Sequence, residues 1–314
     1  MNSVFSPRLS LVQLLTWEVC LPQATEQLSC AVRAVEQIRK MRGGSQSHLM
    51  RCSDGHYYVV KFQNNPQHIR ILANEFLGTA LAKALGLPTS PFSIVYVSPD
   101  LIDLTPELSI ELPRWTSRCE SGFHFGSRYI GNPKEIEFLP PYYDIPAEVL
   151  KHFAGMLVFD KWTCNADWRQ LLFDRSTTSN TISPVMIDQG FCFNQGEWNF
   201  PDSAIRGVYP DWRVYGEIRG IDDFEPWLSR LESELDLGSL WGIADNIPPA
   251  WYEDDRDALA FLLAKLDRRR LLLRDALYSL NDTEWSLFPR WGKSPFWLNN
   301  TSPRHLGRHH AAAI

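Results

Sequence analysis

The sequence lacks any apolar run long enough to cross a membrane, which takes about 20 consecutive apolar residues. It has no low-complexity tract, no internal repeat, and no H-E-x-x-H or G-x-S-x-G motif. These absences argue against a membrane-spanning protein, a repeat protein, a zinc protease and a serine hydrolase. Its 314 residues, 44% hydrophobic and 22% charged, have an ordinary globular composition and suffice for one large domain or for two lobes that share a cleft.

Cysteine is sparse, and basic charge is not in excess. The six cysteines are Cys20, Cys30, Cys52, Cys119, Cys164 and Cys192. No pair has zinc-ligand spacing and the set forms no disulfide framework, so we expect reduced thiols in a cytoplasmic protein. The net charge of −6 argues against a nucleic-acid-binding surface over the whole molecule, although a local phosphate site needs only a few donors. We therefore expect neither a membrane nor nucleic acid as a direct partner.

The first third of the chain has the pattern of a small α+β lobe. Residues 32–41 are expected to form a strand or short helix that leads into the glycine-rich bend at 42–48. Extended patterns lie on both sides of Asp54-Gly55, which is a hairpin signal. Apolar residues then repeat at helical spacing over 69–85, and a strand is expected at 93–97.

The rest of the chain is expected to be mainly helical. Residues 114–131 combine aromatic, glycine and basic residues in what we expect to be a long loop. The elements expected beyond it are a helix over 146–159, strands at 171–173 and 184–187, two weaker helices within 221–237 and a long helix over 254–280. The predicted division is an N-terminal segment at 1–31, an N-lobe with a phosphate loop at 32–100, a helical C-lobe at 101–285 and a C-terminal tail at 286–314.

Phosphoryl transfer needs a cradle for the nucleotide phosphates, a cation on them, and carboxylates that bind magnesium and orient the nucleophile. The bend at Gly43–His48 is a candidate cradle, because glycine lets backbone amides approach phosphate oxygens closely. A simple hairpin turn is the alternative, since the bend is neither G-x-G-x-x-G nor a Walker loop. Lys61, on the next strand, is the candidate cation, and Glu75 on the following helix is its candidate partner. The alternative for Lys61 is a solvated strand end.

Asp160 and Asn165 have the D-x-x-x-x-N spacing of a kinase catalytic loop. In such a loop the aspartate accepts the hydroxyl proton, and the asparagine oxygen binds a second magnesium ion. Asp188 ends an apolar strand just before a turn, where a magnesium-bridging carboxylate reaches the β- and γ-phosphates. Asp167 competes with Asp160 for the base or metal role, and the spacing favours Asp160.

With these groups identified, the chain resembles the HipA-like kinase family over about residues 32–280. The motifs that carry the resemblance are Arg42-Gly43-Gly44-Ser45-Gln46-Ser47, Tyr58-Val59-Val60-Lys61-Phe62, Leu72-Ala73-Asn74-Glu75, Leu85-Gly86-Leu87-Pro88, Phe159-Asp160-Lys161-Trp162 through Asn165, Ile187-Asp188-Gln189-Gly190 and Ile247-Pro248-Pro249-Ala250-Trp251. The resemblance implies a bilobal protein-kinase-like fold with a small β-rich N-lobe. It also implies ATP and Mg²⁺ as cofactors and a Ser or Thr hydroxyl as phosphate acceptor.

The resemblance implies a role for each site residue. Gly43, Gly44, Ser45, Gln46 and Ser47 would form the phosphate loop. Lys61 would bind phosphate, Asp160 would be the base, and Asn165 and Asp188 would bind magnesium.

The chain departs from eukaryotic kinases at two motifs. Asp188-Gln189-Gly190 stands in place of Asp-Phe-Gly, and Val158-Phe159 rather than His-Arg precedes Asp160. In HipA-type toxins a serine near the phosphate loop can be autophosphorylated, and Ser45 and Ser47 are the candidates here. A small-molecule phosphotransferase and an inactive nucleotide-binding scaffold are alternative functions. The acceptor and any antitoxin-like partner cannot be read from this chain.

Overall fold

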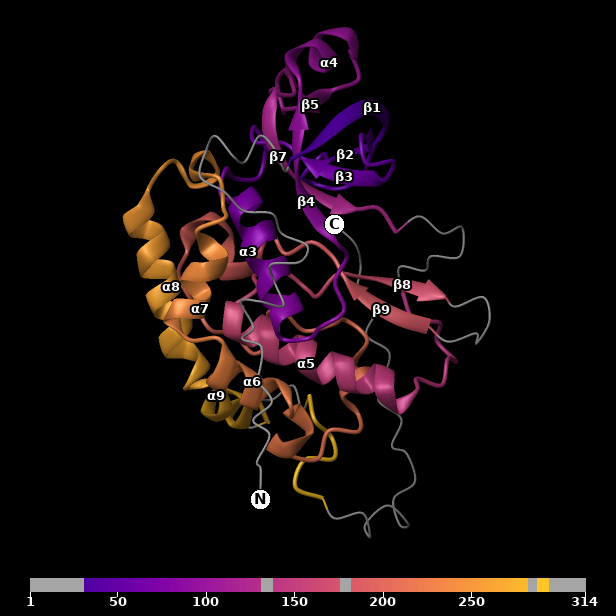
Figure 1. The fold of residues 1–314 in the computed structure, drawn as a ribbon. Coiled ribbons are helices and arrows are strands. Elements are labelled where there is room, and N and C mark those ends of the chain that lie inside the picture. Colours follow the sequence, from indigo (N-terminus) through magenta and orange to yellow (C-terminus); the bar gives the residue numbers. More distant parts are fainter. Residues whose placement is uncertain (1–30, 131–137, 176–181, 282–286, 294–314) are drawn as a thin grey trace, which may run out of the picture.

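The structure is a computed structural model that describes residues 31–130, 138–175, 182–281 and 287–293. Its first part contains β1 (Val32–Lys40), β2 (His48–Cys52), β3 (Tyr57–Lys61), α3 (Ile71–Ala84), β4 (Phe92–Val97), α4 (Pro99–Leu104), β5 (Ser109–Glu111), β6 (Thr116–Arg118) and β7 (Gly122–Arg128). Its second part contains α5 (Ala147–Thr163), β8 (Leu171–Arg175), β9 (Ile182–Met186), α6 (Trp227–Glu234), α7 (Leu237–Ala244), α8 (Arg256–Arg270) and α9 (Leu273–Asn281), with short 3₁₀ turns η1 (Cys192–Glu197), η2 (Trp212–Tyr215), η3 (Ile221–Phe224) and η4 (Pro249–Tyr252). This order confirms the α+β class, with a strand-rich lobe above a helical lobe in Figure 1.

The strand-rich lobe is a closed barrel with the strand order β1-β2-β3-β7-β4. β1 and β2 are antiparallel, with Lys40 opposite His48, so the glycine-rich bend is the loop of this hairpin. Asp54-Gly55 turns the chain between β2 and β3 as expected, and Gly55 has a φ of 82°, which glycine adopts without strain. The barrel thus presents the loop of its first hairpin at one end of the sheet.

The prediction of a long loop over residues 114–131 is wrong, because the strands β6 and β7 lie within this range. β7 pairs antiparallel with both β3 and β4 and so closes the barrel. The strand-rich lobe therefore extends through Arg128, beyond the boundary expected at residue 100.

The helical lobe is built around α5, which crosses its centre in Figure 1. The helix expected to end at Phe159 continues to Thr163, which places Asp160 in the last turn of α5 and not in a loop. The long helix expected over 254–280 is divided into α8 and α9. Residues 287–293, expected as part of the tail, include the buried Phe288, which packs against the ring of Phe224. The remaining tail and residues 1–30 lie outside the described part.

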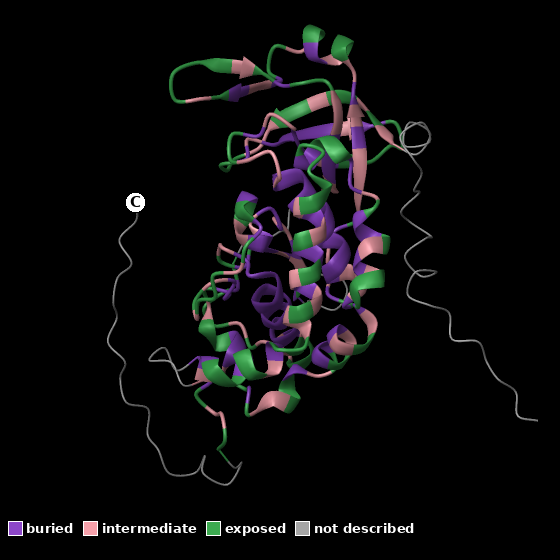
Figure 2. Cartoon of the chain, turned by 90° about the vertical axis from the view of Figure 1, so that its left-hand side faces the viewer, coloured by how far each residue is buried: buried purple, intermediate pink, exposed green. Residues whose placement is uncertain are grey.

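Two clusters of buried side chains correspond to the two lobes. The smaller fills the barrel and consists of Met50, Cys52, Tyr58, Val60, Phe62, Val95, Val97, Ile102, Leu108, Ile110 and Cys119. The larger joins α3 to α5 and the other helices. Every residue of α3 from Ile71 to Ala82 is buried, so this helix is embedded in protein along most of its length. Figure 2 shows the buried zone running through the middle of the helical lobe toward the barrel.

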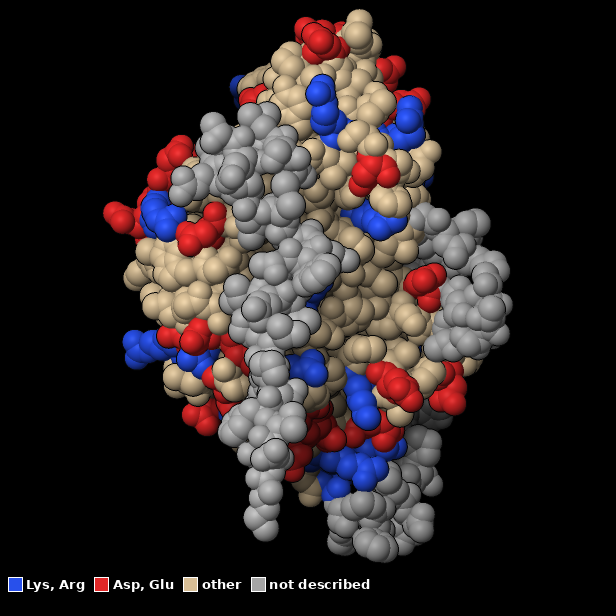
Figure 3. Space-filling view, viewed as in Figure 1, with Lys and Arg blue, Asp and Glu red and all other residues tan. Residues whose placement is uncertain are grey.

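The surface offers no strongly basic tract on the face drawn in Figure 3, where acidic and basic side chains are interspersed. Among the described helices, none combines the length and apolar character that crossing a membrane requires.

Candidate active site

A cavity of about 810 Å³ lies between the two lobes. The β1–β2 loop, Val59 and Lys61 of β3 and Phe125 of β7 line it from the strand-rich lobe. The segments 167–172 and 187–188 line it from the helical lobe. A volume of this size is typical of a small-molecule or cofactor site.

Lys61, Glu75 and Asp188 meet in this cavity. The Lys61 ammonium forms an ion pair with the Glu75 carboxylate, which confirms the predicted pairing of the strand lysine with the helix glutamate. It also donates to Asp188 Oδ1 at 2.6 Å. Lys61 and Glu75 are 7% and 2% exposed, so the alternative of a solvated strand end is excluded.

Lys61 stabilises the charges of both carboxylates, but burial and the nearby Asp188 charge outweigh it at Glu75 and raise the pKa of Glu75 to about 7. Burial by itself would lower the pKa of Lys61, but the carboxylates of Asp188 and Glu75 outweigh it and hold this pKa above its ordinary value. Burial would likewise raise the pKa of Asp188, and the Lys61 charge reverses that effect and holds it below its usual range. The site therefore presents a charged lysine and an ionised aspartate, the groups that a phosphate and a divalent cation would need.

Asp188 follows the end of β9, as the sequence predicts. Its φ is 58°, a conformation that few non-glycine residues adopt and that often marks functional sites. The two residues after it are held by Glu75, whose carboxylate accepts hydrogen bonds from Gln189 N at 3.0 Å and Gly190 N at 2.8 Å. The helix glutamate thus fixes both the lysine and the backbone that carries the aspartate.

The β1–β2 loop places Gly43, Gly44, Ser45 and Ser47 along the cavity. Gly43 has a φ of 115°, which requires glycine. Gln46, expected to contact the phosphates, turns its side chain elsewhere: its amide donates to Glu111 O at 2.6 Å and accepts from Glu111 N at 2.7 Å. Gln46 therefore anchors the loop to β5.

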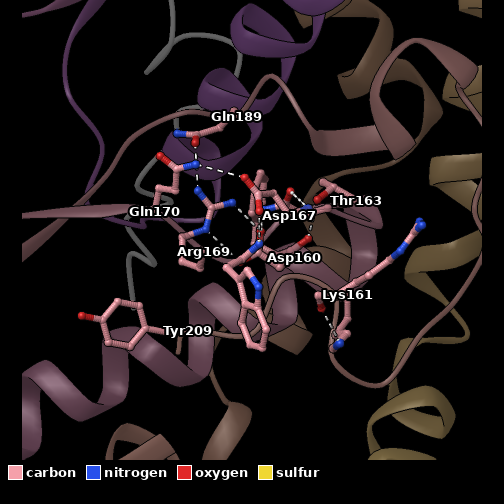
Figure 4. Close-up of polar contacts among 12 residues, drawn as sticks. Asp160, Lys161, Thr163, Asp167, Arg169, Gln170, Gln189 and Tyr209 are labelled. Carbon is pink, nitrogen blue, oxygen red and sulfur yellow. Dashed lines mark hydrogen bonds and ion pairs between the residues drawn. The ribbon is translucent and has the colours of Figure 1, made fainter. Parts of the chain in front are cut away.

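Asp160 is 1% exposed and is not among the residues that line the cavity. Both of its carboxylate oxygens accept hydrogen bonds from Arg169, which is 2% exposed (Figure 4). Gly207 covers it, since an added Cβ there would lie 2.4 Å from Asp160 Cβ. A carboxylate that is buried, paired with arginine and absent from the cavity wall suits a positioning role.

Arg169 extends the same network to the residues that flank Asp188. Its guanidinium also donates to Ile187 O at 3.1 Å and to Gln189 Oε1 at 2.9 Å, so it holds the residues on either side of Asp188. This contact explains why a polar side chain stands at the middle position of Asp-Gln-Gly. Neither Arg169 nor this use of Gln189 was expected from the sequence. A single arginine belongs to no recognisable sequence motif, and the residues that Arg169 contacts are not its neighbours in the sequence.

Asn165 is also buried, at 1% exposure, and does not line the cavity. Its amide donates to Asp160 Oδ1 at 3.0 Å, and its oxygen accepts from Asp167 N at 3.2 Å. Its oxygen is thus engaged in shaping the loop after α5. This loop starts at Cys164, whose φ of 51° ends the helix.

Asp167 and Gln170 lie on the cavity wall that faces Lys61 and the β1–β2 loop. Gln170 Nε2 donates to Asp167 Oδ2 at 3.0 Å, and Figure 4 shows the two side chains next to each other. Asp167 N is oriented by Asn165, and Asp167 O accepts from Gly207 N at 2.9 Å. The carboxylate is thus accessible on a fixed backbone. The sequence offered Asp167 as the alternative to Asp160 for the base or metal role. It gave no sign of Gln170, because the spacing of this residue matches no kinase motif.

The donor set suits magnesium. Within the described residues, no three His, Cys, Asp or Glu side chains converge as a complete metal cage. Mg²⁺ rarely uses such a cage, because it keeps several waters and is bound through one or two carboxylates together with substrate phosphates. Asp188, Asp167 and Gln170 all line the cavity and carry carboxylate or amide oxygens of that kind.

Comparisons with known proteins bear on the family and the fold of the chain. A family model described as HipA-like kinase matches residues 34–279. Among solved structures, the Helicobacter pylori proinflammatory kinase CtkA aligns with a TM-score of 0.52 at 15% identity, over 80% of this chain and 96% of that one. The Golgi casein kinase with Mn/ADP bound gives a TM-score of 0.48 at 12% identity, over 81% of this chain and 73% of that one. No curated protein matches the chain.

Proposed function

Because the chain belongs to the HipA-like kinase family and is therefore a phosphotransferase, we propose that it transfers the γ-phosphate of Mg-ATP to a Ser or Thr hydroxyl of a protein. The observation that carries this proposal is the assembly of Lys61, Glu75 and Asp188 in one cavity, opposite the accessible Asp167. These groups supply the cation, the metal ligand and the base that phosphoryl transfer requires.

The cavity has a polar and an apolar part that match a nucleotide. Val59 and Phe125 from the barrel and Leu171 and Ile187 from the helical lobe supply apolar surface for an adenine ring. The backbone of the β1–β2 loop and Lys61 supply donors for the phosphates. The ring would enter between the lobes and the phosphates would extend toward Asp188.

Asp167 takes the base role in this proposal, and Asp160 positions it through Asn165, which contacts both residues. A base must come within hydrogen-bond reach of the acceptor hydroxyl, and Asp167 lines the cavity while Asp160 does not. Asp188 and the oxygen of Gln170 would hold magnesium. A bound magnesium ion would neutralise the charge that develops on the β- and γ-phosphates.

Autophosphorylation of Ser45 or Ser47 is part of the proposal. Both serines lie at the cavity, but they are 9% and 4% exposed. The β1–β2 loop must therefore leave its present position before either hydroxyl is phosphorylated.

The test uses ATP labelled in its γ-phosphate, the purified chain and a cell lysate, with acid hydrolysis to identify the labelled amino acids. We expect phosphoserine or phosphothreonine with the wild type and a loss of label with Asp188→Ala. Label in a small molecule alone would overturn the protein acceptor, and no transfer from the wild type to any acceptor would overturn the proposed activity. Label at Ser45 or Ser47, located by peptide mass spectrometry, would establish autophosphorylation.

A further inference from the structure

The segment that follows Asp188 wraps around a single side chain of α3. Asn74 is 0% exposed, and its amide nitrogen lies 2.8 Å from Gly190 O, 3.1 Å from Cys192 O and 2.7 Å from Gln195 O. Its amide oxygen accepts a hydrogen bond from Trp198 Nε1 at 2.8 Å. One buried amide thus contacts both ends and the middle of residues 190–198.

Neighbouring residues of α3 add contacts of complementary kind. Glu75 accepts hydrogen bonds from the backbone N–H groups of Gln189 and Gly190, while Asn74 donates to backbone carbonyls. One turn earlier, Arg70 donates to Gly196 O at 3.0 Å, and its guanidinium lies 4.5 Å from the centre of the Trp198 ring. Two side chains of α3 and that of Arg70, the residue at its N-cap, therefore hold the whole segment.

The backbone of this segment is strained. Phe193, Asn194, Gln195 and Trp198 have φ values of 59°, 56°, 62° and 50°, in the region that favours glycine. Such conformations are unfavourable for residues other than glycine and persist only where the surroundings impose them. The contacts from α3 are the surroundings that do so here.

α3 itself is embedded. Its residues from Ile71 to Ala82 are buried in the larger core together with α5. In protein kinases that are switched by phosphorylation, the equivalent lysine–glutamate pair and metal-binding segment must be brought into place. A helix buried in this way cannot swing out without exposing that core.

We propose that Asn74 clamps residues 189–198 to α3, so that Lys61, Glu75 and Asp188 stay assembled without nucleotide, phosphorylation or a partner protein. The inference rests on the proposed function and adds its mode of regulation. Residues 189–198 are permanently in place, so regulation of the activity must act on another part of the site. Asn74 is a positioning residue in this account, because it contacts the backbone of the segment and not the reacting atoms.

The test compares wild type, Asn74→Ala and the milder Trp198→Phe, which keeps the ring over Arg70 and removes only the indole donor. The exposed Glu197→Ala, in the same segment, is the matched control. Hydrogen exchange is measured on the ligand-free, phosphatase-treated chain, so this readout does not depend on activity. We expect slow exchange of amides 189–198 in wild type and Glu197→Ala, and fast exchange confined to this segment in Asn74→Ala, with a smaller increase in Trp198→Phe.

A second readout is the concentration of Mg²⁺ or Mn²⁺ needed for half-maximal ATP turnover. Asn74→Ala should raise it by about 10- to 100-fold, the usual effect of losing a residue that orients a metal ligand, while Glu197→Ala leaves it unchanged. Fast exchange of the segment in the wild type, or slow exchange in both Asn74→Ala and Trp198→Phe, would overturn the clamp. A protected segment in a wild type without phosphotransfer would instead sink the proposed function and leave the clamp standing.

Discussion

At the scale of single residues, Asp160 and Asp167 show which site residues a spacing motif can identify and which it cannot. The Asp160–Asn165 spacing matches a kinase catalytic loop, but α5 runs through Thr163 and turns Asp160 toward Arg169 in the interior. Spacing alone cannot reveal this, because it depends on where the helix ends. Lys61, Glu75 and Asp188 were predictable since each sits at a strand end or on a helix face that its local pattern defines.

Replacing Asp167 by Asn should lower kcat by about 10²- to 10⁴-fold, the range for loss of a general base, with little change in KM for ATP. Steady-state kinetics with the labelled acceptor, and a melting curve to confirm the fold, provide the measurement. Asp160→Asn should lower stability as well as rate. If Asp167→Asn keeps wild-type kcat, Asp167 is not the base.

The buried Asp160–Arg169 pair should behave as a coupled unit. Asp160→Leu or Arg169→Met alone leaves an unpaired buried charge and should cost about 3–5 kcal/mol of unfolding free energy. The double variant removes both charges. We therefore expect its loss of unfolding free energy to be smaller than the sum of the losses of the two single variants, with a coupling free energy of about 1–3 kcal/mol. Urea denaturation of the four proteins measures this, and additive losses would contradict it.

At the scale of elements, the helices and hairpins with local signals were predictable and the closing strand was not. β7 carries Gly122 and Gly126, which weaken a strand pattern. Gly126 is required by packing, since an added Cβ would lie 2.4 Å from Val95 Cγ2. The partners of β7 are distant in the chain, so its pairing left no local signal. The break between α8 and α9 likewise has no glycine or proline to mark it.

Acidic pH should lower the unfolding free energy of the protein through two buried histidines of the barrel. Burial lowers the pKa of His48 to about 4 and that of His124 to about 3, from an ordinary value of 6.5. Each ring therefore takes up a proton on unfolding below pH 6.5, so stability is full above that pH and falls as the pH drops toward the lowered values.

Urea denaturation between pH 7 and pH 5 should show a loss of up to about 1.4 kcal/mol per pH unit for each histidine. The variant with both His48→Gln and His124→Gln is the control. Its unfolding free energy should be lower at pH 7 and should change less with pH. If this variant kept the wild-type slope, groups other than these histidines would be responsible for the pH dependence.

At the scale of the whole molecule, the two lobes with separate cores meet at one cavity, and neither lobe holds the site alone. The sequence predicted this arrangement in outline, because a strand-rich part precedes a helical part. It did not predict that α3 belongs to the core of the helical lobe, since a helix buried on all sides has no polar face to show which lobe it joins.

The most direct test of a magnesium–nucleotide site between the lobes is the thermal unfolding of wild type and Asp188→Ala with ATP, in the presence of Mg²⁺ or of a chelator. Mg-ATP at about 100 times its Kd should stabilise the wild type by about 2.7 kcal/mol, which raises Tm by a few degrees. Chelation and Asp188→Ala should each diminish this shift. An unchanged Tm in the wild type, or a shift that Asp188→Ala retains in full, would contradict the account.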